Sequence, residues 1–524
     1  MSDFRLTCGA LPSTTVVVGF TGREGLSELY EFELFLLVPS ENCADLDLDG
    51  VLQAKATLSV ARDRNDRDPI AYQGVIRAIE IVYATASTAL FRATLGPRHA
   101  DLTLTEHNLM FTQKSIPDVL TVALSDAAVP TDATKQQLSG SYSPEEHVCQ
   151  YRESSYAFAS RWMHREGMYF FFDHGGDGEV MVVVDDKSAH VAGPATEVRY
   201  HPVSAGDASA GQAFSSFARG ERLATASVVV RDYDHKKPSL DVSGTKSAAT
   251  NGVSEIVLHG ARAFTAADAA RVAGLRAEEV LSAASFAVGR GSVVGLRPGY
   301  TFELTDHPDD ALNTTYLIVE VRHAARHTSE GTDFAHLAGA DFPPGYHVEV
   351  AAVPASVQYR APSRHPWPSV PGFELAKIDS PRSDHYADLD DQGQYTVRFL
   401  FDESTLDAGK ASTRVRMMQP HAGSPEGFHF PLRKGTEVAM AFLGGDPDRP
   451  VIAGALANAQ TPSPVTQANH TQNVVQTGGN TRLAVEDQDG GQYVDLSVPT
   501  ESSFVSLGAD HDGGRTHNVV KSTT

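Results

Sequence analysis

Alternating apolar and polar residues dominate the first 362 residues and predict a region made mostly of β-strands. Each run alternates with a period of two or holds consecutive β-branched and aromatic residues, and Gly, Pro or Asp bounds it. The predicted strands cover residues 16–20, 30–38, 54–61, 72–83, 90–96, 168–172, 301–304 and 316–322.

Three stretches of the same region repeat apolar residues every three to four positions, which is typical of amphipathic helices. Ser115 and Thr265 are each followed three residues later by Asp, the capping box of a helix start. Ser154 or Ser155 begins the second helix, and Gly167 stands where its C-terminus needs a left-handed residue. The predicted helices cover residues 116–124, 156–166 and 265–284.

A Pro-rich stretch at residues 361–369 is typical of a linker and marks the clearest boundary in the chain. Beyond it, five predicted strands fall within about ninety residues, which fits an OB-type barrel. The Gly- and Pro-rich residues 444–450 join the last two strands and predict a tight loop. The predicted barrel strands cover residues 373–379, 395–401, 413–418, 436–443 and 451–456.

After residue 458 the composition shifts to Thr, Gln, Asn and Pro, and alternation then returns near the C-terminus. Short strands separated by Gly and Asp turns suit a β-helix, in which one row of apolar residues points to one side. A lone chain would leave such a row exposed, whereas three chains winding together would bury it. The apolar residues expected to share this face are Leu483, Val485, Val494, Leu496, Val498, Val505 and Leu507.

Length and charge limit the number of domains and the kinds of binding partner that can be expected. A chain of 524 residues exceeds one hydrophobic core, so two to four domains are expected. With 43 Lys and Arg against 66 Asp and Glu, the formal net charge is −23. Binding to nucleic acids or to anionic membrane surfaces needs basic surface, so this balance argues against both.

The number of cysteines and the N-terminal residues indicate the cellular compartment in which the protein folds. Cys8, Cys43 and Cys149 are too few and too scattered for a disulfide framework or a zinc cluster, which fits a reducing cytosol. The N-terminus lacks the basic and apolar regions of a Sec signal, and no run of 18 apolar residues occurs. If the protein leaves the cell, we expect a route that accepts folded cargo.

No catalytic, cofactor-binding or metal-binding site is expected. The chain contains no GxSxG, GxGxxG or CxxC motif and no P-loop. His164 lies near Glu166, but neither has a nucleophile or metal partner in the sequence, so we interpret the pair as part of a helix surface.

Two apparent metal motifs are also interpreted as coincidental. Residues 45–50 match the start of an EF-hand loop, but Ala56 stands at the twelfth position, where a bidentate Glu is required. His323 and His327 have the four-residue spacing of a helical metal site, but they extend a strand-like run, where such residues lie over about 10 Å apart.

Several phrases together resemble the VgrG family, the spike proteins of type VI secretion, which are related to the hub and needle proteins of contractile phage tails. Residues 390–399, DDQGQYTVRF, are similar to the family's DxxGR(V)KVxF strand, except that Gln394 and Tyr395 replace a basic or β-branched residue. The other phrases are GREGLSELYEF at 22–32, QYRES at 150–154, RWMHREGMYFFF at 161–172, FHFPLRKGTEV at 428–438 and GDPDRPVIAG at 445–454.

The resemblance implies a mainly β fold in three parts. Residues 1–362 would form a hub of two barrel-like β-domains with inserted helices, so that three chains make a pseudo-sixfold ring. Residues 363–460 would be an OB-type neck. Residues 461–524 would be a linker and the start of an intertwined trimeric β-helix, as a short or truncated needle.

The resemblance also implies a function: a homotrimeric spike that caps the tube, carries effectors and punctures target membranes, with only transient membrane penetration. Its partners would be a hexameric Hcp-like tube protein, a PAAR-type tip protein or effectors, and baseplate components. It would be cytoplasmic before firing and then injected without a Sec signal.

Two other functions stay open. A phage-type tail hub could carry a peptidoglycan-lytic role, although the roughly twenty residues between barrel and needle are fewer than a domain needs. An OB-type module could bind carbohydrate or nucleic acid, although residues 373–460 hold 9 Lys and Arg against 13 Asp and Glu.

Overall fold

A computed structural model describes most of the chain, which forms two compact units. The described residues are 4–42, 46–63, 65–202, 211–327, 344–500, 503–508 and 519–521. Unit 1 comprises Met1–His107, Gln113–Glu145 and Arg152–Trp367. Unit 2 comprises Asn108–Thr112, Glu146–Tyr151 and Pro368–Thr524. The unit boundary at Trp367 falls inside the stretch predicted as a linker, while the three-part division of the sequence stays a prediction.

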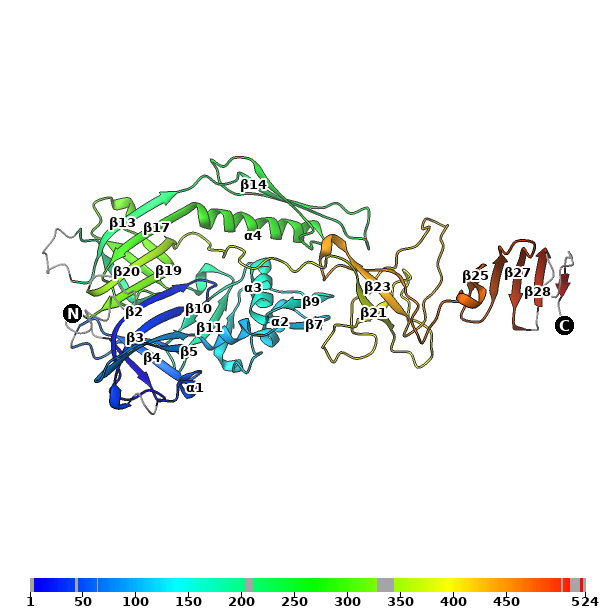
Figure 1. The fold of residues 1–524 in the computed structure, drawn as a ribbon. Helices are drawn as coiled ribbons and strands as arrows, with labels where there is room; N and C mark the ends of the chain where they lie inside the picture. The colour runs from blue at the N-terminus through cyan, green and yellow to red at the C-terminus, as the bar shows by residue number, and fades with distance from the viewer. Residues whose placement is uncertain are drawn as a thin grey trace. The chain divides into compact units, whose positions relative to one another are not determined.

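A twelve-stranded sheet forms most of unit 1 (Figure 1). Its main path runs β1-β4-β5-β6-β3-β2-β19-β20-β17-β13, with β18 paired to β19 and β12 to β18. The antiparallel pairing of β2 with β19 joins residues about three hundred positions apart, such as Gly25 and Glu320. The strands are β1 (Phe4–Cys8), β2 (Val16–Gly25), β3 (Glu31–Pro39), β4 (Lys55–Val60), β5 (Ile70–Ala84), β6 (Thr88–Gly96), β12 (Ala192–Arg199), β13 (Phe214–Glu221), β17 (Ser285–Gly291), β18 (Thr301–Thr305), β19 (Thr315–Arg326) and β20 (Gly345–Pro354).

Two three-stranded sheets and four helices complete unit 1. The caps of the three predicted helices are as expected: Ser115 and Thr265 accept hydrogen bonds from the backbone N–H groups of Asp118 and Asp268. Ser154, rather than Ser155, caps the second. The elements are α1 (Leu48–Val51), α2 (Ile116–Ala123), α3 (Ser155–Glu166), α4 (Ala266–Ala284), β8 (Thr134–Gln137), β10 (Tyr169–Asp173), β11 (Val180–Val184), β14 (Ser227–Asp232), β15 (Val242–Ser247) and β16 (Glu255–His259).

The barrel of unit 2 contains four ladder strands in the order β22-β21-β23-β24. The fifth predicted strand, residues 413–418, is wrong as a regular strand. This segment makes single bridges, Tyr395 with Val415 and Met417 with Ile452. It therefore crosses between the two edges of the sheet instead of pairing along either one. The strands are β21 (Glu374–Asp379), β22 (Thr396–Phe399), β23 (Glu437–Phe442) and β24 (Pro450–Ala455).

The barrel core also contains side chains from a region that the sequence assigned to the hub. Strands β7 (His107–Phe111) and β9 (Val148–Glu153) pair with each other. Their residues Met110, Cys149 and Tyr151 are buried in one cluster with the barrel residues around Phe399 and Met440. The backbone N–H of Cys149 donates to the Asp448 carboxylate, so the predicted tight loop at 444–450 holds this strand pair.

The C-terminal part of unit 2 is a five-stranded antiparallel sheet in the order β25-β26-β27-β28-β29. Each strand pairs with the next along the chain, so the sheet is a meander. The strands are β25 (Gln472–Gln476), β26 (Arg482–Glu486), β27 (Tyr493–Val498), β28 (Ser503–Gly508) and β29 (Val519–Lys521).

Candidate functional site

The apolar residues predicted near the C-terminus lie together on one face of the β26–β28 sheet. Leu496 lies directly opposite Leu483 on one side and Val505 on the other. A second row is made in the same way by Val485, Val494 and Leu507. Val498 lies on the same face of β27, two residues beyond Leu496, because side chains alternate along a strand.

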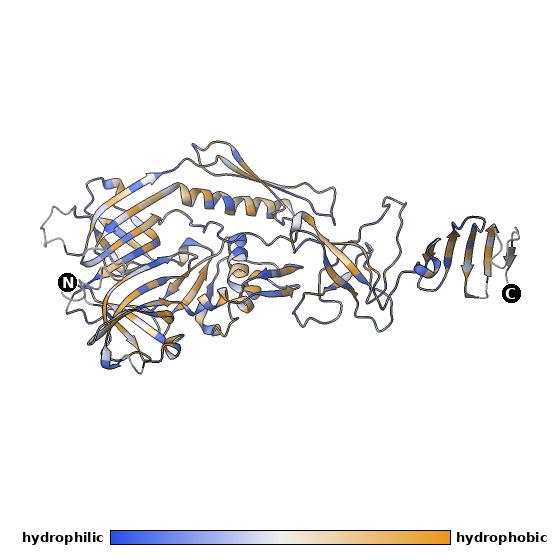
Figure 2. Ribbon diagram, viewed as in Figure 1, coloured by the Kyte–Doolittle hydropathy of each residue, from blue (hydrophilic) through white to orange (hydrophobic). Residues whose placement is uncertain are grey.

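This apolar face is open to solvent in the single chain. The exposed fractions of its residues reach 48% at Leu496 and 49% at Leu507. In Figure 2, orange on these strands marks their hydrophobic residues. Contiguous exposed apolar faces are typical of surfaces that associate with another protein.

The opposite face of the same sheet carries both polar and apolar residues, and several of its polar side chains bond to one another. The Gln472 side-chain amide donates to the Tyr493 hydroxyl at 2.9 Å, and Arg482 donates to the Gln472 side-chain oxygen at 2.7 Å. Asp495 and Ser497 alternate with the apolar residues of β27 and therefore point to this side. The two faces thus differ in chemistry: the face that carries Leu496 presents the row of exposed aliphatic residues.

Residues 359–367, most of which lie in the Pro-rich stretch predicted as a linker, are bound along unit 1. Arg360 donates to the backbone oxygens of Gly167 and Asp185 at 2.6 and 2.5 Å, and its Nε donates to Glu278 at 2.8 Å. Arg364 forms an ion pair with Glu28. These contacts hold residues 359–367, here called the strap, in one conformation.

Aromatic and cationic side chains fasten the end of the strap. The ring of Trp367 meets that of Trp162 of α3 edge to face, with centroids 5.1 Å apart. The guanidinium carbons of Arg161 and Arg262 lie 4.2 and 3.9 Å from the Trp367 ring centroid. Because such cation–π contacts stabilise by up to about 2 kcal/mol each when desolvated, this cluster anchors the strap to α3.

The structure gives His164 and Glu166 separate partners. His164 Nε2 lies 3.1 Å from the Glu279 carboxylate of α4, and Arg276 contacts the same imidazole. Glu166 instead forms ion pairs with Arg165 and, at 2.9 Å, with Arg271. Both residues therefore hold α3 against α4.

A buried hydrogen-bonded chain that the sequence analysis missed links Glu24, His323 and Tyr346. His323 lies 2.7 Å from the Tyr346 hydroxyl through Nδ1 and 3.0 Å from Glu24 through Nε2. All three side chains are buried, and burial raises the pKa of Tyr346 well above its usual value, so its hydroxyl stays protonated. We assign these three hydrogen-bonded side chains a structural role. No local signal could reveal it, because its members come from β2, β19 and β20.

The two histidines with metal-like spacing do not converge. His323 belongs to the buried chain just described, whereas the ring of His327 stacks on Phe4 with centroids 4.0 Å apart. Across the described ranges, no group of three or more His, Cys, Asp or Glu side chains is arranged to hold a metal ion. Residue 45, the first of the EF-hand-like stretch, lies outside the described residues.

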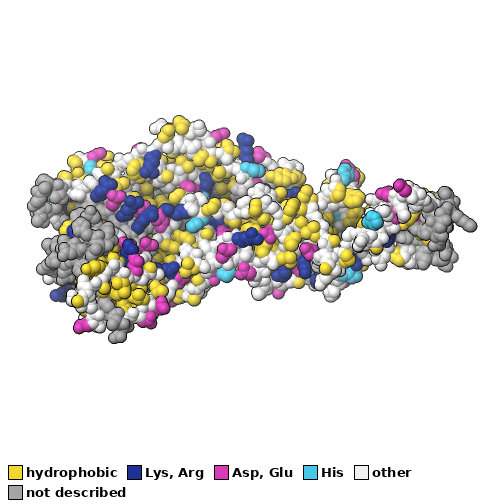
Figure 3. Space-filling view, viewed as in Figure 1, with side chains coloured by type: hydrophobic (Ala, Val, Ile, Leu, Met, Phe, Trp, Pro, Cys, Tyr) yellow, Lys and Arg dark blue, Asp and Glu magenta, His cyan; other side chains and the backbone are white. Residues whose placement is uncertain are grey.

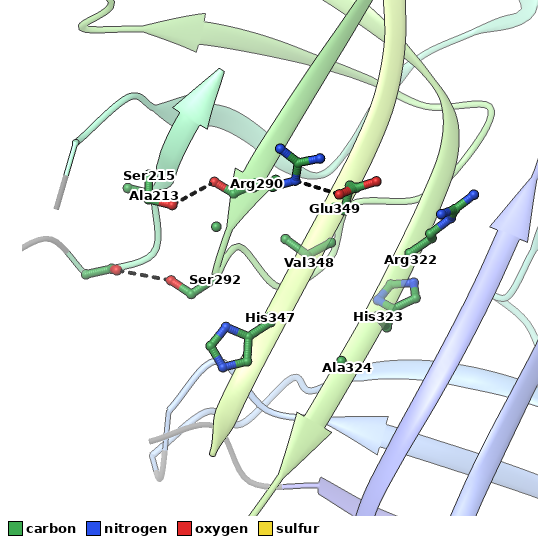
Figure 4. Close-up of a pocket in the computed structure, with 12 residues that line it drawn as sticks. Ala213, Ser215, Arg290, Ser292, Arg322, His323, Ala324, His347, Val348 and Glu349 are labelled. Carbon is green, nitrogen blue, oxygen red and sulfur yellow. Dashed lines mark hydrogen bonds and ion pairs between the residues drawn. The ribbon is translucent and has the colours of Figure 1, made fainter. Parts of the chain in front are cut away.

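A shallow groove of about 510 Å³ lies on the sheet face formed by β13, β17, β19 and β20 (Figure 4). Arg290 of this groove donates to Glu349 at 2.6 Å, and Arg322 donates to Glu320 at 2.7 Å. Acidic and basic side chains are intermingled elsewhere on the face shown in Figure 3. The arginines of the groove are thus neutralised within the chain.

Two buried histidines predict that unit 1 loses stability in mild acid. Burial, the largest cause, lowers the pKa of His99 to about 4, with Arg98 lowering it further and Glu179 opposing. Burial and then Arg297 lower the pKa of His174 well below its usual value. The unfolded chain takes up these protons near pH 6.5, so stability is full above that pH and falls as the pH drops. We expect His99 alone to cost about 1.4 kcal/mol per pH unit below 6.5, and roughly 3 kcal/mol by pH 4.

Urea unfolding followed by tryptophan fluorescence at pH 7.5 and 5.5 checks this prediction. The chain has 2 tryptophans, Trp162 and Trp367, and both belong to unit 1. His99→Gln keeps a hydrogen-bonding group near Thr134 and should flatten the pH dependence, whereas His385→Gln, at an exposed position of unit 2, should not. An unchanged slope in His99→Gln would show that His99 is not responsible.

Each unit matches a family model. Residues 23–329 match the phage tail baseplate hub (GPD) model, and residues 387–456 match the OB domain of type VI secretion system and phage-baseplate injectors. No helix in the described part of the chain is long and apolar enough to cross a membrane.

Curated relatives include two type VI secretion system spike proteins of Pseudomonas aeruginosa, VgrG4b and VgrG1b. Each is 28% identical to this chain, over 94% and 90% of its length. The chain spans 62% and 64% of the length of these two relatives. The actin cross-linking toxin VgrG1 of Vibrio cholerae is 26% identical over 93% of this chain, which covers 45% of that protein.

Solved structures show the same fold at low identity. The E. coli c3393 protein is a type VI secretion component described as similar to the T4 phage tail proteins gp27 and gp5. It aligns with a TM-score of 0.62 and 21% identity, and the alignment covers 86% of this chain and 100% of that one. A chain of the Francisella PdpA-VgrG complex aligns with a TM-score of 0.62 and 8% identity, covering 99% of this chain and 88% of that one. The chain belongs to the phage tail baseplate hub family, and over most of its length it is similar to the VgrG spike proteins of type VI secretion.

Proposed function

We propose that this chain is the trimeric spike of a contractile injection machine and that three copies bury their apolar C-terminal faces against one another. The observation that carries the proposal is the pair of exposed apolar rows through Leu496 and Val494. Three such faces can enclose a common core, in which each strand contributes alternate residues. Burial of each row gains free energy in proportion to the apolar area removed from water.

Stiffness is the property that the chain supplies to the machine. The strap is fastened to unit 1 by hydrogen bonds and ring contacts, and the strands of the β25–β29 meander pair consecutively. In this proposal the work comes from a contracting sheath, and the role of the chain is mechanical rather than catalytic. Membership of the baseplate hub family and similarity to VgrG spike proteins support this assignment.

The partners and the location follow from the same proposal. The hub end would cap a hexameric Hcp-like tube and contact baseplate components. The needle end would carry a PAAR-type tip or effectors through the target membrane. A VgrG of Francisella is known in complex with PdpA, which supports a further protein partner for a chain of this fold. The protein would reside in the cytoplasm until firing and then be injected without a Sec signal.

Native mass spectrometry of the full chain tests the proposal most directly. We expect three copies, which persist at micromolar concentration and resist dissociation by heat or SDS, because interchain β-packing buries a large apolar area. A stable monomer at micromolar concentration would exclude a trimeric spike. Release of peptidoglycan fragments by this chain alone would favour a lytic hub instead.

A further inference from the structure

Two of the places where the chain passes between unit 1 and unit 2 adjoin residues that bind the same arginine. The chain passes between the units five times, and two of these passages follow Tyr151 and Trp367. Glu153 lies just beyond the first passage, and Trp367 is the last residue before the second. Both side chains contact Arg161 of α3, although they are far apart in the sequence.

The ion pair with Glu153 fixes the orientation of the Arg161 guanidinium. Arg161 Nε donates to one carboxylate oxygen at 2.9 Å, and its Nη2 donates to the other at 2.6 Å. A planar guanidinium and a carboxylate joined by two such hydrogen bonds have a defined mutual geometry. Arg161 is buried, so bulk water does not compete for these donors. The Glu153 carboxylate therefore sets the plane in which the guanidinium lies.

The guanidinium held in this way carries the ring of Trp367. Its central carbon lies 4.2 Å from the centroid of that ring. The attraction between a cation and an aromatic ring depends on the cation lying over the ring, within about 6 Å of its centroid. A shift of the Arg161 side chain would therefore weaken its hold on Trp367.

The backbone beside the first passage is in a conformation that needs support. Arg152 has a φ of 47°, in the left-handed region that is unfavourable for residues other than glycine. Such a conformation persists where the surrounding structure over-determines it. On its C-terminal side, Glu153 is bound by Arg161. The next residue, Ser154, is the N-cap of α3 and accepts a hydrogen bond from the backbone N–H of Ala157. Helix α3 thus holds the chain where it enters unit 1.

A separate contact fastens the other end of the strap. Arg360 Nε donates to Glu278 of α4 at 2.8 Å, seven residues before Trp367. This contact binds the strap to a different helix from the one that carries Arg161. It therefore offers a comparison within the same chain, because it can be weakened without changing the Arg161–Glu153 pair.

We propose that Arg161 is a positioning residue that couples the two segments, so that loosening either one loosens the other. Loss of the Glu153 carboxylate frees the guanidinium to move from its place over Trp367, and loss of the Trp367 ring opens the ion pair to water. Coupling of this kind is a free energy between two contacts and is therefore reciprocal. A pull on either segment is then shared by both. The inference concerns the single chain and does not depend on the proposed trimer.

A double-mutant cycle on the full chain tests the coupling. Urea unfolding, followed by the fluorescence of Trp162, gives the factor by which Trp367→Leu lowers the folding equilibrium constant. We expect this factor to be at least about threefold smaller in a Glu153→Gln background than in the wild type, because side chains that share one network are coupled to this extent. Equal factors in the two backgrounds, or a larger factor in Glu153→Gln, would overturn the inference.

Two replacements of Arg161 show whether this residue carries the coupling. In an Arg161→Met background, Trp367→Leu and Glu153→Gln should act independently. Arg161→Lys keeps the charge beside Glu153 but lacks the planar fork. It should regain part of the stability that methionine loses, while the two substitutions still act independently. Coupling that persists with methionine or with lysine contradicts a role based on the orientation of the guanidinium.

Hydrogen exchange measured by mass spectrometry keeps the test open where a double variant folds poorly. Glu153→Gln should speed exchange in the strap at least about threefold, although no strap residue is changed. Trp367→Leu should likewise speed exchange in β9. The matched control, Glu278→Gln, releases Arg360 and should speed exchange in the strap alone.

The pattern of exchange decides the outcome. Unchanged exchange in the strap of Glu153→Gln overturns the inference, as does faster exchange spread evenly over unit 1, which indicates a general loss of stability. A wild-type chain that proves to be monomeric removes the proposed function and leaves this test intact.

Discussion

Leu496→Asp is expected to abolish assembly of three chains while leaving the single chain folded. Leu496 lies in the centre of its row, between Leu483 and Val505, and is half exposed in one chain. In the proposed trimer each copy would place a carboxylate in the shared apolar core. An unpaired buried charge costs about 3–5 kcal/mol, so three of them cost on the order of 10 kcal/mol per trimer.

Size-exclusion chromatography with light scattering measures the result, with a shift from three chains to one expected at micromolar concentration. Ser497→Asp provides the matched control, because the adjacent residue adds the same charge to the polar face of the same strand, beside Arg482. We expect that variant to assemble as the wild type does. If Leu496→Asp and Ser497→Asp assembled equally well, the apolar core shared by the three chains would not include Leu496.

Arg161→Met is expected to destabilise unit 1 by about 3–5 kcal/mol, the cost of breaking a buried ion pair by removing one partner. Arg161 is 1% exposed, and its guanidinium donates to both carboxylate oxygens of Glu153, with distances from 2.6 Å. The same group lies over the Trp367 ring that anchors the strap. Methionine fills similar volume but supplies neither interaction.

Urea unfolding followed by tryptophan fluorescence reports this loss, because both tryptophans adjoin Arg161. The double variant Arg161→Met, Glu153→Gln separates the two contributions. Removing the carboxylate charge as well should restore much of the ion-pair loss and leave the smaller cation–π loss of about 1–2 kcal/mol. A loss below about 1 kcal/mol in the single variant would mean that solvent or other groups replace Arg161.

Short sequence patterns predicted the structural elements that depend on contacts between residues close together in the chain. The N-cap side chains of Ser115 and Thr265 and the left-handed Gly167, with φ of 75°, set helix ends through contacts within a few residues. The face shared by Leu483, Leu496 and Val505 follows from the period of two along each strand. That these strands form consecutive pairs keeps the predicted residues in register across the sheet.

Features made by distant residues could not be predicted in this way. The prolines of the predicted linker are visible locally, whereas Arg161 and Arg262, which lie over the ring of Trp367, are far away in the sequence, so the contacts of the strap could not be predicted. Apolar and polar residues alternate around Val415 as in a strand, but the segment bridges two edges of the sheet and forms no continuous ladder of hydrogen bonds with either edge. The buried chain through His323 depends on residues from both ends of unit 1.

The paired strands β7 and β9 tie the inheritance of the two units together. A gene segment beginning at Pro368 would encode a barrel lacking Met110, Cys149 and Tyr151, three side chains of its own core. Recombination at the Pro-rich boundary, which would look like a natural place to exchange one neck for another, would therefore combine a barrel with a strand pair shaped for a different one. Successful exchange in this lineage requires the strand pair and the barrel to move together, or the core to be repacked by compensating substitutions.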